Sequence, residues 1–410
     1  MRQYSNPGLR FTLIGSLYVS QAIPLGFFTV ALPAILRARG VELQNIGLLS
    51  ALALPWLIKF LWAPFVDRYG AQRWGHYRSW IFPLQGLSVL SVVAIAALDP
   101  STYMGPLILA GALFMFLAAT QDVATDGLSV HILSREERGP GNGIQVGGFY
   151  LGQILGGGVM LLVFGRFGWT IALMAMANFL ALPLFPALRF REPPHGQTGE
   201  SVDFRALGRF FTRSGNRPWL LILIFFRAGE AMAVTMVNPM LVDLGYSLAQ
   251  IGLLLGVAGS LAAFAGATAG GLLIQRLGRK PSLVVFGLLQ SVALCGYLLP
   301  ATGLGGEKAI YLVAVMVSFT GGMATAALYT NMMDRCCRQT AATDFSLQQS
   351  LAAVGPVLAA TLSGFSASAL GYSAHFMACV ALNVAVLLVV ARWLVHPVAA
   401  IPEPATGTGQ

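Results

Sequence analysis

Charged residues are scarce in this chain of 410 residues. Asp, Glu, Lys and Arg together make up 10% of it, whereas 56% of the residues are hydrophobic. Soluble domains carry about 25% charged residues, so an ordinary soluble domain is excluded. The net charge of +9 does not indicate nucleic acid, because the basic residues lie in short loops between apolar runs. We therefore expect a polytopic membrane protein, with the lipid bilayer as its surroundings and no nucleic-acid partner.

Cysteine and histidine are also rare. The four cysteines offer no disulfide framework and no metal-ligand spacing. The five histidines lie far apart along the chain, which disfavours a metal site without excluding one. We expect no metal and no cofactor.

Long apolar runs dominate what is present. Counting about 20 residues for each crossing of a bilayer, hydropathy predicts twelve transmembrane helices in two pseudo-symmetric sets of six, an all-α membrane protein. The expected segments are 11–36, 45–66, 79–98, 105–130, 142–165 and 169–189, then 218–243, 249–275, 282–300, 308–333, 345–369 and 374–394. The expected domains are an N-terminal bundle (1–189), a cytoplasmic linker (190–217), a C-terminal bundle (218–394) and a cytoplasmic tail (395–410).

The distribution of Lys and Arg predicts the orientation. If both termini are cytoplasmic, nineteen of the 25 basic residues fall on the inner side, four in outer loops and two within spans. Cytoplasmic loops carry the excess of Lys and Arg in membrane proteins. We therefore expect both termini in the cytoplasm.

Two carboxylates lie inside the fourth predicted span. Asp122 and Asp126 are four residues apart, so they share one helix face about 6 Å apart, and each costs about 2.5 kcal/mol or more in hydrocarbon. Such a pair resists losing both protons together, and we predict that it carries a proton. The alternative is that both acids only solvate a water-filled cleft. Lys59 lies at a similar depth, about 12 Å from the inner end against about 14 Å for Asp122, and is expected to hold one Asp ionised.

Other polar residues inside the spans are candidates for a second ion pair and for ligand contact. Arg227 and Glu230 are three residues apart in the seventh span and can pair along one helix; a structural salt bridge and a substrate or gating role both remain open. Each remaining polar residue alone is more often a helix–helix hydrogen bond than a ligand contact. The substrate-binding candidates are Tyr18, Gln21, Gln121, Tyr150, Gln153, Asn238, Tyr329 and Asn331.

A loop motif repeats in the two halves. Ala63-Pro-Phe-Val-Asp67-Arg68-Tyr-Gly70 follows the second span, and Gly271-Leu-Leu-Ile-Gln275-Arg276-Leu-Gly278-Arg279-Lys280 follows the eighth, 208 residues later. The pair resembles the signature Gly-x-Leu-x-Asp-Arg-x-Gly-Arg-Arg of the major facilitator superfamily. We expect this loop to brace one conformation, with Asp67 accepting hydrogen bonds from an arginine or a neighbouring helix N-terminus; a simple cluster of charges at a helix end is the alternative. The gating residues expected from the motif are Asp67, Arg68, Gly70, Arg276, Gly278 and Arg279.

Three stretches resemble the muropeptide permease (AmpG) group of that superfamily. They are 59–69, 119–127 and Arg227-Ala-Gly-Glu230, and the resemblance implies proton-driven import across a bacterial inner membrane. Where that group has Gly-Tyr-Arg-x-Gly in the fifth span, this chain has Gly148-Phe149-Tyr150-Leu151-Gly152, and extra C-terminal spans are missing. In these respects the chain is similar to the siderophore importers of the rhizobactin and pyochelin type.

The function expected from these resemblances is proton symport of a small-molecule substrate, a pyochelin-type siderophore or its iron chelate. A muropeptide or other amphiphile permease is the alternative. An intramembrane aspartyl protease needs two carboxyls that converge on one water, usually from different helices, whereas Asp122 and Asp126 share one helix. We therefore expect no enzyme.

Overall fold

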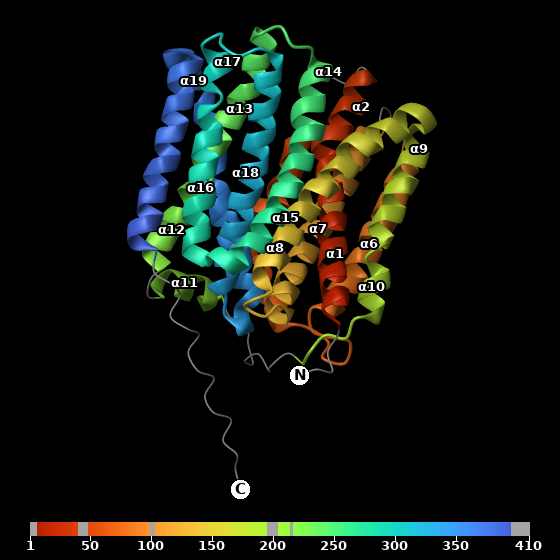
Figure 1. Ribbon diagram of the computed structural model, residues 1–410. Coiled ribbons are helices and arrows are strands. Elements are labelled where there is room, and N and C mark those ends of the chain that lie inside the picture. Colours follow the sequence, from red (N-terminus) through yellow and green to blue (C-terminus); the bar gives the residue numbers. More distant parts are fainter. Residues whose placement is uncertain (1–5, 40–47, 99–102, 195–203, 214–215, 395–410) are drawn as a thin grey trace.

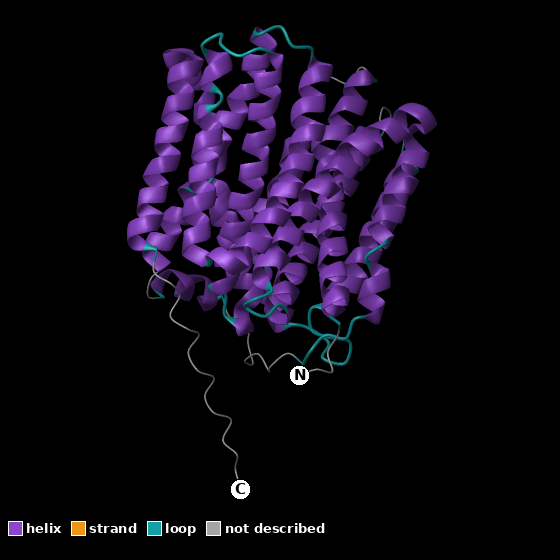
Figure 2. Ribbon diagram, viewed as in Figure 1, coloured by secondary structure: helices purple, strands orange, loops and turns teal. Residues whose placement is uncertain are grey.

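The computed structural model describes residues 6–39, 48–98, 103–194, 204–213 and 216–394, and within these ranges only helices and loops occur (Figure 2). The predicted tail lies outside the described residues, as does part of the predicted linker. In chain order the elements are α1 (Pro7–Gly26), η1 (Phe27–Ala31), α2 (Leu32–Ala38), η2 (Leu48–Ala53), α4 (Leu54–Ile58), η3 (Lys59–Leu61), α5 (Ala63–Arg68), α6 (Arg78–Ala96), α7 (Met104–Ile132), α8 (Arg138–Ile154), η4 (Leu155–Val159), α9 (Met160–Ala181), α10 (Leu184–Arg189), α11 (Arg205–Thr212), α12 (Asn216–Phe225), α13 (Ala228–Asp243), α14 (Leu248–Ile251), η5 (Gly252–Ala258), α15 (Gly259–Leu277), α16 (Arg279–Cys295), α17 (Leu298–Ala301), α18 (Glu307–Asp334), η6 (Arg338–Thr340) and α19 (Ala341–Trp393).

Nine helical runs among the described residues are long and apolar enough to cross a membrane. Two of them, Arg138–Arg189 and Arg338–Trp393, are 52 and 56 residues long, more than twice the length of about 20 that one crossing needs. Each contains a glycine with a positive φ that interrupts the helical backbone, Gly168 at 81° and Gly371 at 76°. The predicted boundaries near 166–168 and 370–373 coincide with these glycines.

The predicted helix 45–66 is wrong as a single element. The described part of this stretch consists of η2, α4, η3 and α5. Pro55 and Pro64 lie in the first turns of α4 and α5. Proline is favoured there because first-turn N–H groups have no acceptor within the helix, whereas inside one continuous helix it would remove a hydrogen bond. The seventh predicted span is also interrupted: α12 ends at Phe225, and α13 begins at Ala228 with Arg227 as its N-cap residue.

Helix α1 begins and α19 ends at the same face of the molecule, at the bottom of Figure 1; we call it the terminal face. Near it, one hydrophobic core takes residues from both the first half (7–189) and the second half (216–393), including Tyr77 and Leu128 together with Phe286 and Phe345. Two further cores belong to one half each. The described halves therefore share a core only towards the terminal face.

Helices α8 and α15 bring the two halves into backbone contact, and Figure 1 shows them side by side. A Cβ on Gly139 would lie 2.7 Å from the carbonyl oxygen of Gly271, and one on Gly143 would lie 2.8 Å from that of Ala267. Glycine is needed here because any side chain would push the helices apart. The contact is of the small-residue kind that lets membrane helices approach closely.

Candidate functional site

A buried ionic cluster lies where the broken second span meets α7. The Lys59 ammonium, on η3, donates to Asp122 Oδ2 and also to Asp126 Oδ2 at 3.3 Å. Its third hydrogen bond goes to Gln349 Oε1 on α19, in the other half. All three side chains of the ionic cluster are at most 5% exposed. The depth argument placed Lys59 against Asp122, and that contact is present.

The second oxygen of Asp126 is held by neutral donors. The Tyr18 hydroxyl donates to Asp126 Oδ1 at 2.7 Å, and Gln145 Nε2 donates to it at 3.2 Å. Tyr18 lies on α1, Gln145 on α8 and Lys59 on η3. Donors from three elements of the first half therefore hold the Asp126 carboxylate. A buried charge persists only when paired and hydrogen-bonded, and both conditions are met. The cluster's role in proton coupling stays a prediction.

The second intramembrane ion pair lies at the break between α12 and α13. Arg227 Nε donates to Glu230 Oε2 at 3.2 Å. A third of the Arg227 side chain is exposed, 33%, and 13% of that of Glu230. Arg227, which lies between the two parts of one span, is therefore partly exposed, whereas the Lys59 side chain is only 3% exposed.

Two tyrosines lie near these charged groups. Tyr329 of α18 is near Arg227 and Lys59, and Tyr150 of α8 is near Arg227 and Glu230. Both rings are half-buried. Together with Arg227, they are the predicted candidates that remain open to a ligand.

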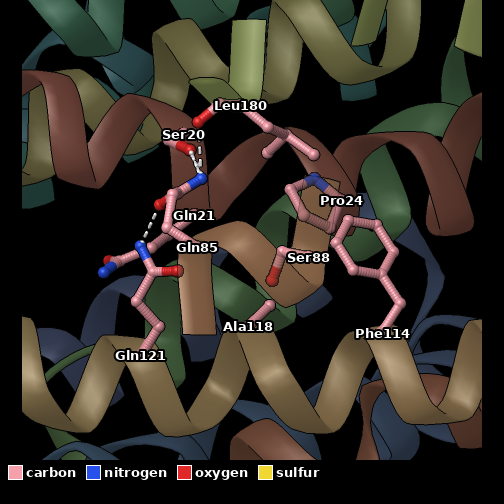
Figure 3. Close-up of a pocket in the computed structure, with 9 residues that line it drawn as sticks. All are labelled: Ser20, Gln21, Pro24, Gln85, Ser88, Phe114, Ala118, Gln121 and Leu180. Carbon is pink, nitrogen blue, oxygen red and sulfur yellow. Dashed lines mark hydrogen bonds between the residues drawn. The ribbon is translucent and has the colours of Figure 1, made fainter. Parts of the chain in front are cut away.

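Three other candidates are bonded to protein groups inside the first half. Tyr18 is bonded to Asp126, Gln21 Nε2 donates to Thr125 Oγ1 at 2.5 Å, and Gln121 donates to Gln85 Oε1. Figure 3 shows Gln21, Gln85 and Gln121 around a small cavity with Ser20 and Ser88. Its free space of about 10 Å³ suits about one water molecule. This cavity is therefore too small for a solute.

The last three candidates lie elsewhere. Gln153 is half-buried and packs against Gly26 of α1, with its backbone oxygen 2.8 Å from where a Cβ on Gly26 would stand. Asn238 is exposed on α13. Asn331 is buried and donates to the carbonyl oxygens of Ala327 at 2.9 Å and Arg279 at 3.4 Å, which places it beside the terminal-face ion pairs.

At the terminal face, Asp67 of the first half binds the N-terminus of α19 in the second. Its carboxylate accepts the backbone N–H groups of Ala342 at 3.0 Å and Thr343 at 2.8 Å, and the Thr343 hydroxyl at 2.6 Å. The Tyr77 hydroxyl donates to it at 2.9 Å. Burial raises the pKa of Asp67 to about 6, against the opposing effect of these hydrogen bonds.

A second connection between the halves passes through Asp334, at the end of α18. Arg138 of the first half donates to its Oδ1 at 2.9 Å, and Arg279 of the second half donates to its Oδ2 at 2.6 Å. Gln275, which stands at the Asp position of the second motif copy, donates to the Glu136 carbonyl oxygen at 3.0 Å. Each copy of the loop motif therefore contacts the half of the molecule to which it does not belong. The first copy does so through the Asp67 carboxylate and the second through the Gln275 amide.

The remaining motif residues differ in surroundings. Gly278 has φ 85° and separates α15 from α16, a backbone conformation that favours glycine. Gly70 has no room for a side chain, since a Cβ would lie 2.5 Å from His76 Nδ1. Arg68 lies over the Tyr69 ring at 5.8 Å, and Arg276 is exposed. Their gating role stays a prediction.

The predicted linker contacts the terminal face from both of its ends. Glu192 accepts the N–H groups of Tyr77 at 3.1 Å and Arg78 at 3.0 Å, where α6 begins. Arg213 pairs with Asp344 of α19 through both Nη atoms, at 2.7 and 3.3 Å. Neither contact could be predicted from the sequence, because acids and bases that are far apart in the chain do not indicate their partners.

Two buried glutamines were missed as well. Gln85 of α6 donates to Ser20 Oγ at 3.0 Å and to the Leu180 oxygen at 2.6 Å, and Gln290 of α16 accepts from Thr320. They are 205 residues apart, close to the offset of the loop motif. That spacing could have identified both.

Known proteins resemble the chain over most of its length. The anhydromuropeptide permease of Escherichia coli K12 is 31% identical over 406 residues, covering 96% of this chain and 81% of the permease. A Haemophilus influenzae protein is 28% identical over 381 residues, covering 89% and 90% of the two chains.

Solved transporter structures share the fold. The E. coli fucose:proton symporter matches with a TM-score of 0.74 at 15% identity, covering 95% of this chain and 99% of that one. The human organic anion transporter MFSD10 matches with a TM-score of 0.72 at 16% identity, covering 94% and 100%.

The expectation of siderophore import is wrong. It depended on Tyr150 in place of an arginine and on a shorter C-terminal part, whereas the similarity to the anhydromuropeptide permease extends over 96% of the chain. One changed side chain does not outweigh a similarity that extends over nearly the whole chain. The alternative of a muropeptide-type permease is the better supported one.

The family model of the Major Facilitator Superfamily matches residues 14–343 and 219–409, which together span nearly the whole sequence. The resemblance carried by the two loop motifs thus extends from the first span to the last. This chain is a membrane protein that belongs to the major facilitator superfamily.

Proposed function

We propose that this protein is a proton-coupled permease that imports a muropeptide or a related amphiphilic sugar-peptide across the bacterial inner membrane. The observation that carries the proposal is the buried cluster in which one cation, Lys59, contacts two carboxylates, Asp122 and Asp126. The E. coli relative named for anhydromuropeptide supports the class of solute. The family and these relatives support transport rather than catalysis.

The proposed topology has twelve spans in two bundles of six, residues 1–189 and 218–394. Nine helical runs, the division of two of them at Gly168 and Gly371, and the broken stretch from Leu48 to Arg68 together support this number. The start of α1 and the end of α19 on one face support an even number of crossings (Figure 1). The excess of Lys and Arg supports a cytoplasmic terminal face and cytoplasmic termini.

The charges of the ionic cluster and of the Arg227–Glu230 pair support coupling to one proton at a time. Fully ionised, Lys59 and Arg227 oppose Asp122, Asp126 and Glu230, which leaves one negative charge in excess. A single proton on the aspartate pair restores neutrality, and a neutral site is far cheaper to move through the membrane interior. One proton crossing 100 mV supplies about 2.3 kcal/mol, enough for a roughly 50-fold accumulation of solute.

In the proposed cycle the halves rock about this midplane site. The present conformation has its halves joined at the terminal face through Asp67 and Asp334. Proton and solute enter from the opposite side. Asp67 must then release α19, and Arg68, Gly70, Arg276, Gly278 and Arg279 complete the proposed gating loops. Opening of the cytoplasmic side delivers the solute.

Uptake into proteoliposomes tests the proposal. With an inward proton gradient, wild-type protein should accumulate labelled anhydromuropeptide, and Asp122→Asn should not. Asp243→Asn, which changes an exposed aspartate bonded to Tyr372 on the surface, is the matched control and should transport normally. Uptake that ignores the gradient, or full transport by Asp122→Asn, would overturn the coupling. Uptake of other solutes but not anhydromuropeptide would overturn the solute class.

A further inference from the structure

The two intramembrane cations differ in how many of their hydrogen-bond donors are occupied. Lys59 has three N–H donors, and all three are used, by Asp122, Asp126 and Gln349. Arg227 has five donors. Among the described residues its only hydrogen bond is the one from Nε to Glu230. The four N–H groups of its two Nη atoms are therefore available, on a side chain that is 33% exposed.

The position of Arg227 suits an anion. As the N-cap residue of α13 it lies at the positive end of a helix of 16 residues. The paired Nη groups of a guanidinium match the two oxygens of a carboxylate. Tyr150 and Tyr329 lie near Arg227, and both are half-buried. A neutral ligand group would gain little from this arrangement.

A vacant donor lies beside the present partner of Arg227. Gln290 Nε2 is buried and has no hydrogen-bond partner among the described residues, and the whole residue is 2% exposed. Its oxygen is already taken by the Thr320 hydroxyl. A buried amide without a partner costs about 1–3 kcal/mol, which makes Gln290 a site prepared for an acceptor.

Gly321 provides the space between Glu230 and this donor. A Cβ at position 321 would clash with Glu230 Oε1 and would lie 3.5 Å from Gln290 Nε2. Because glycine leaves that space open, the Glu230 carboxylate can turn from Arg227 towards Gln290 without meeting a side chain at 321. Glu230 then has two positions, one on the cation and one on the amide.

We propose that Arg227 binds a carboxylate of the transported solute and that Glu230 is its internal substitute, moving to Gln290 Nε2 when the solute arrives. The inference rests on the proposed function in that a transported solute must reach Arg227, and it specifies the chemistry of that solute as an acid. In the empty protein Glu230 keeps the arginine paired. In the loaded protein the solute takes the Nη groups, and the buried amide gains its acceptor.

Ligand-induced thermal stabilisation of the purified full-length protein tests this inference. The probes are anhydromuropeptide and an N-acetyl dipeptide, each as the free acid and as the amide. Arg227→Gln should weaken binding of the acids by about 30-fold and leave binding of the amides unchanged. Glu230→Gln should tighten binding of the acids, since it removes the competing carboxylate.

Gln290→Leu completes a double-mutant cycle. It should weaken acid binding in the wild type by about tenfold and have no effect in the Glu230→Gln background, where no carboxylate needs the amide. Gln85→Leu, the change at the matching position of the first half, is the control and should treat acid and amide alike. Correct folding of each variant is checked by its melting temperature without ligand.

The outcomes separate this inference from the proposed function. Preference for the dipeptide acid over its amide, without binding of either anhydromuropeptide form, would overturn the proposed solute and support the carboxylate site. Equal losses for acid and amide in Arg227→Gln would overturn the carboxylate site. Equal effects of Gln290→Leu with and without Glu230→Gln would overturn the movement of Glu230.

Discussion

Neutralising Asp334 should open the terminal face. The Asp334 side chain is 3% exposed and holds Arg138 and Arg279, which are 14% and 12% exposed, and only the bond to Arg138 joins the halves. Removing one partner of a buried ion pair costs about 3–5 kcal/mol. Because the arginines here retain some hydration, we expect about 2–3 kcal/mol for Asp334→Asn. The ratio of open to closed protein should therefore rise roughly 30- to 150-fold.

Thiol labelling of Cys336 measures this change. Cys336 packs against the core shared by the halves, and burial raises the pKa of its thiol well above the usual value, so the closed form reacts slowly. With Cys295, Cys337 and Cys379 changed to serine, the labelling rate should follow the open population. Opening hydrates the thiol and should accelerate labelling.

The matched control is an ion pair at the same face within one half. Arg10 binds Glu137 at 2.6 Å, each side chain 20% exposed, and both belong to the first half. Glu137→Gln should leave Cys336 labelling near the wild-type rate. Equal acceleration in both variants would attribute the effect to general loosening, and unchanged labelling in Asp334→Asn would refute the reasoning from the ion pair.

Three further predictions concern the buried ionic cluster, the Asp67 contact at the terminal face and the contact between α8 and α15. Asp126→Asn should abolish gradient-driven uptake while the protein still folds and binds solute, since the Tyr18 bond can persist; uptake at the wild-type rate would contradict the coupling role. The closed form binds the Asp67 proton more tightly than the open form, because burial raises this pKa from 3.8 to about 6. That stabilisation is complete below about pH 3.8 and is lost as pH rises through about 6, so spin-label distances across the terminal face should widen over this range in wild type and not in Asp67→Asn. Gly143→Val should slow transport by forcing α8 from the Ala267 carbonyl oxygen, whereas Gly158→Val, which meets open space, should not.

Much of the fold could be predicted from hydropathy, because a bilayer demands long apolar runs. The breaks near Lys59 and Arg227 could not, since a 20-residue average does not register a short interruption. In the second span the interruption had a local cause that the sequence displayed, namely Pro55 and Pro64 in the first turns of new helices. Apolar residues on both sides of the break kept the average hydropathy of the stretch high, so the average did not reveal the break.

One part of the site could be predicted, because the free-energy cost of an unpaired charge in the membrane limits which residue can be its partner. A lysine in hydrocarbon must find an acid at its own depth, and this argument paired Lys59 with Asp122. It could not find Gln349, which is neutral and lies 290 residues from Lys59. The choice of solute was wrong, because one substitution, at Tyr150, says less about the solute than the similarity of nearly the whole chain to the anhydromuropeptide permease.

Among the described residues, the bond to Gln349 is the only hydrogen bond of Lys59 that crosses between the halves. Its two aspartates travel with it on the first half, but the glutamine travels with the second. If the two halves separate near Lys59, the ammonium loses the Gln349 oxygen as an acceptor. It must then donate to another acceptor, from water or from the solute. The hydrogen bonding of one ammonium group therefore depends on whether the halves meet at this level, and that same group contacts Asp122 and Asp126.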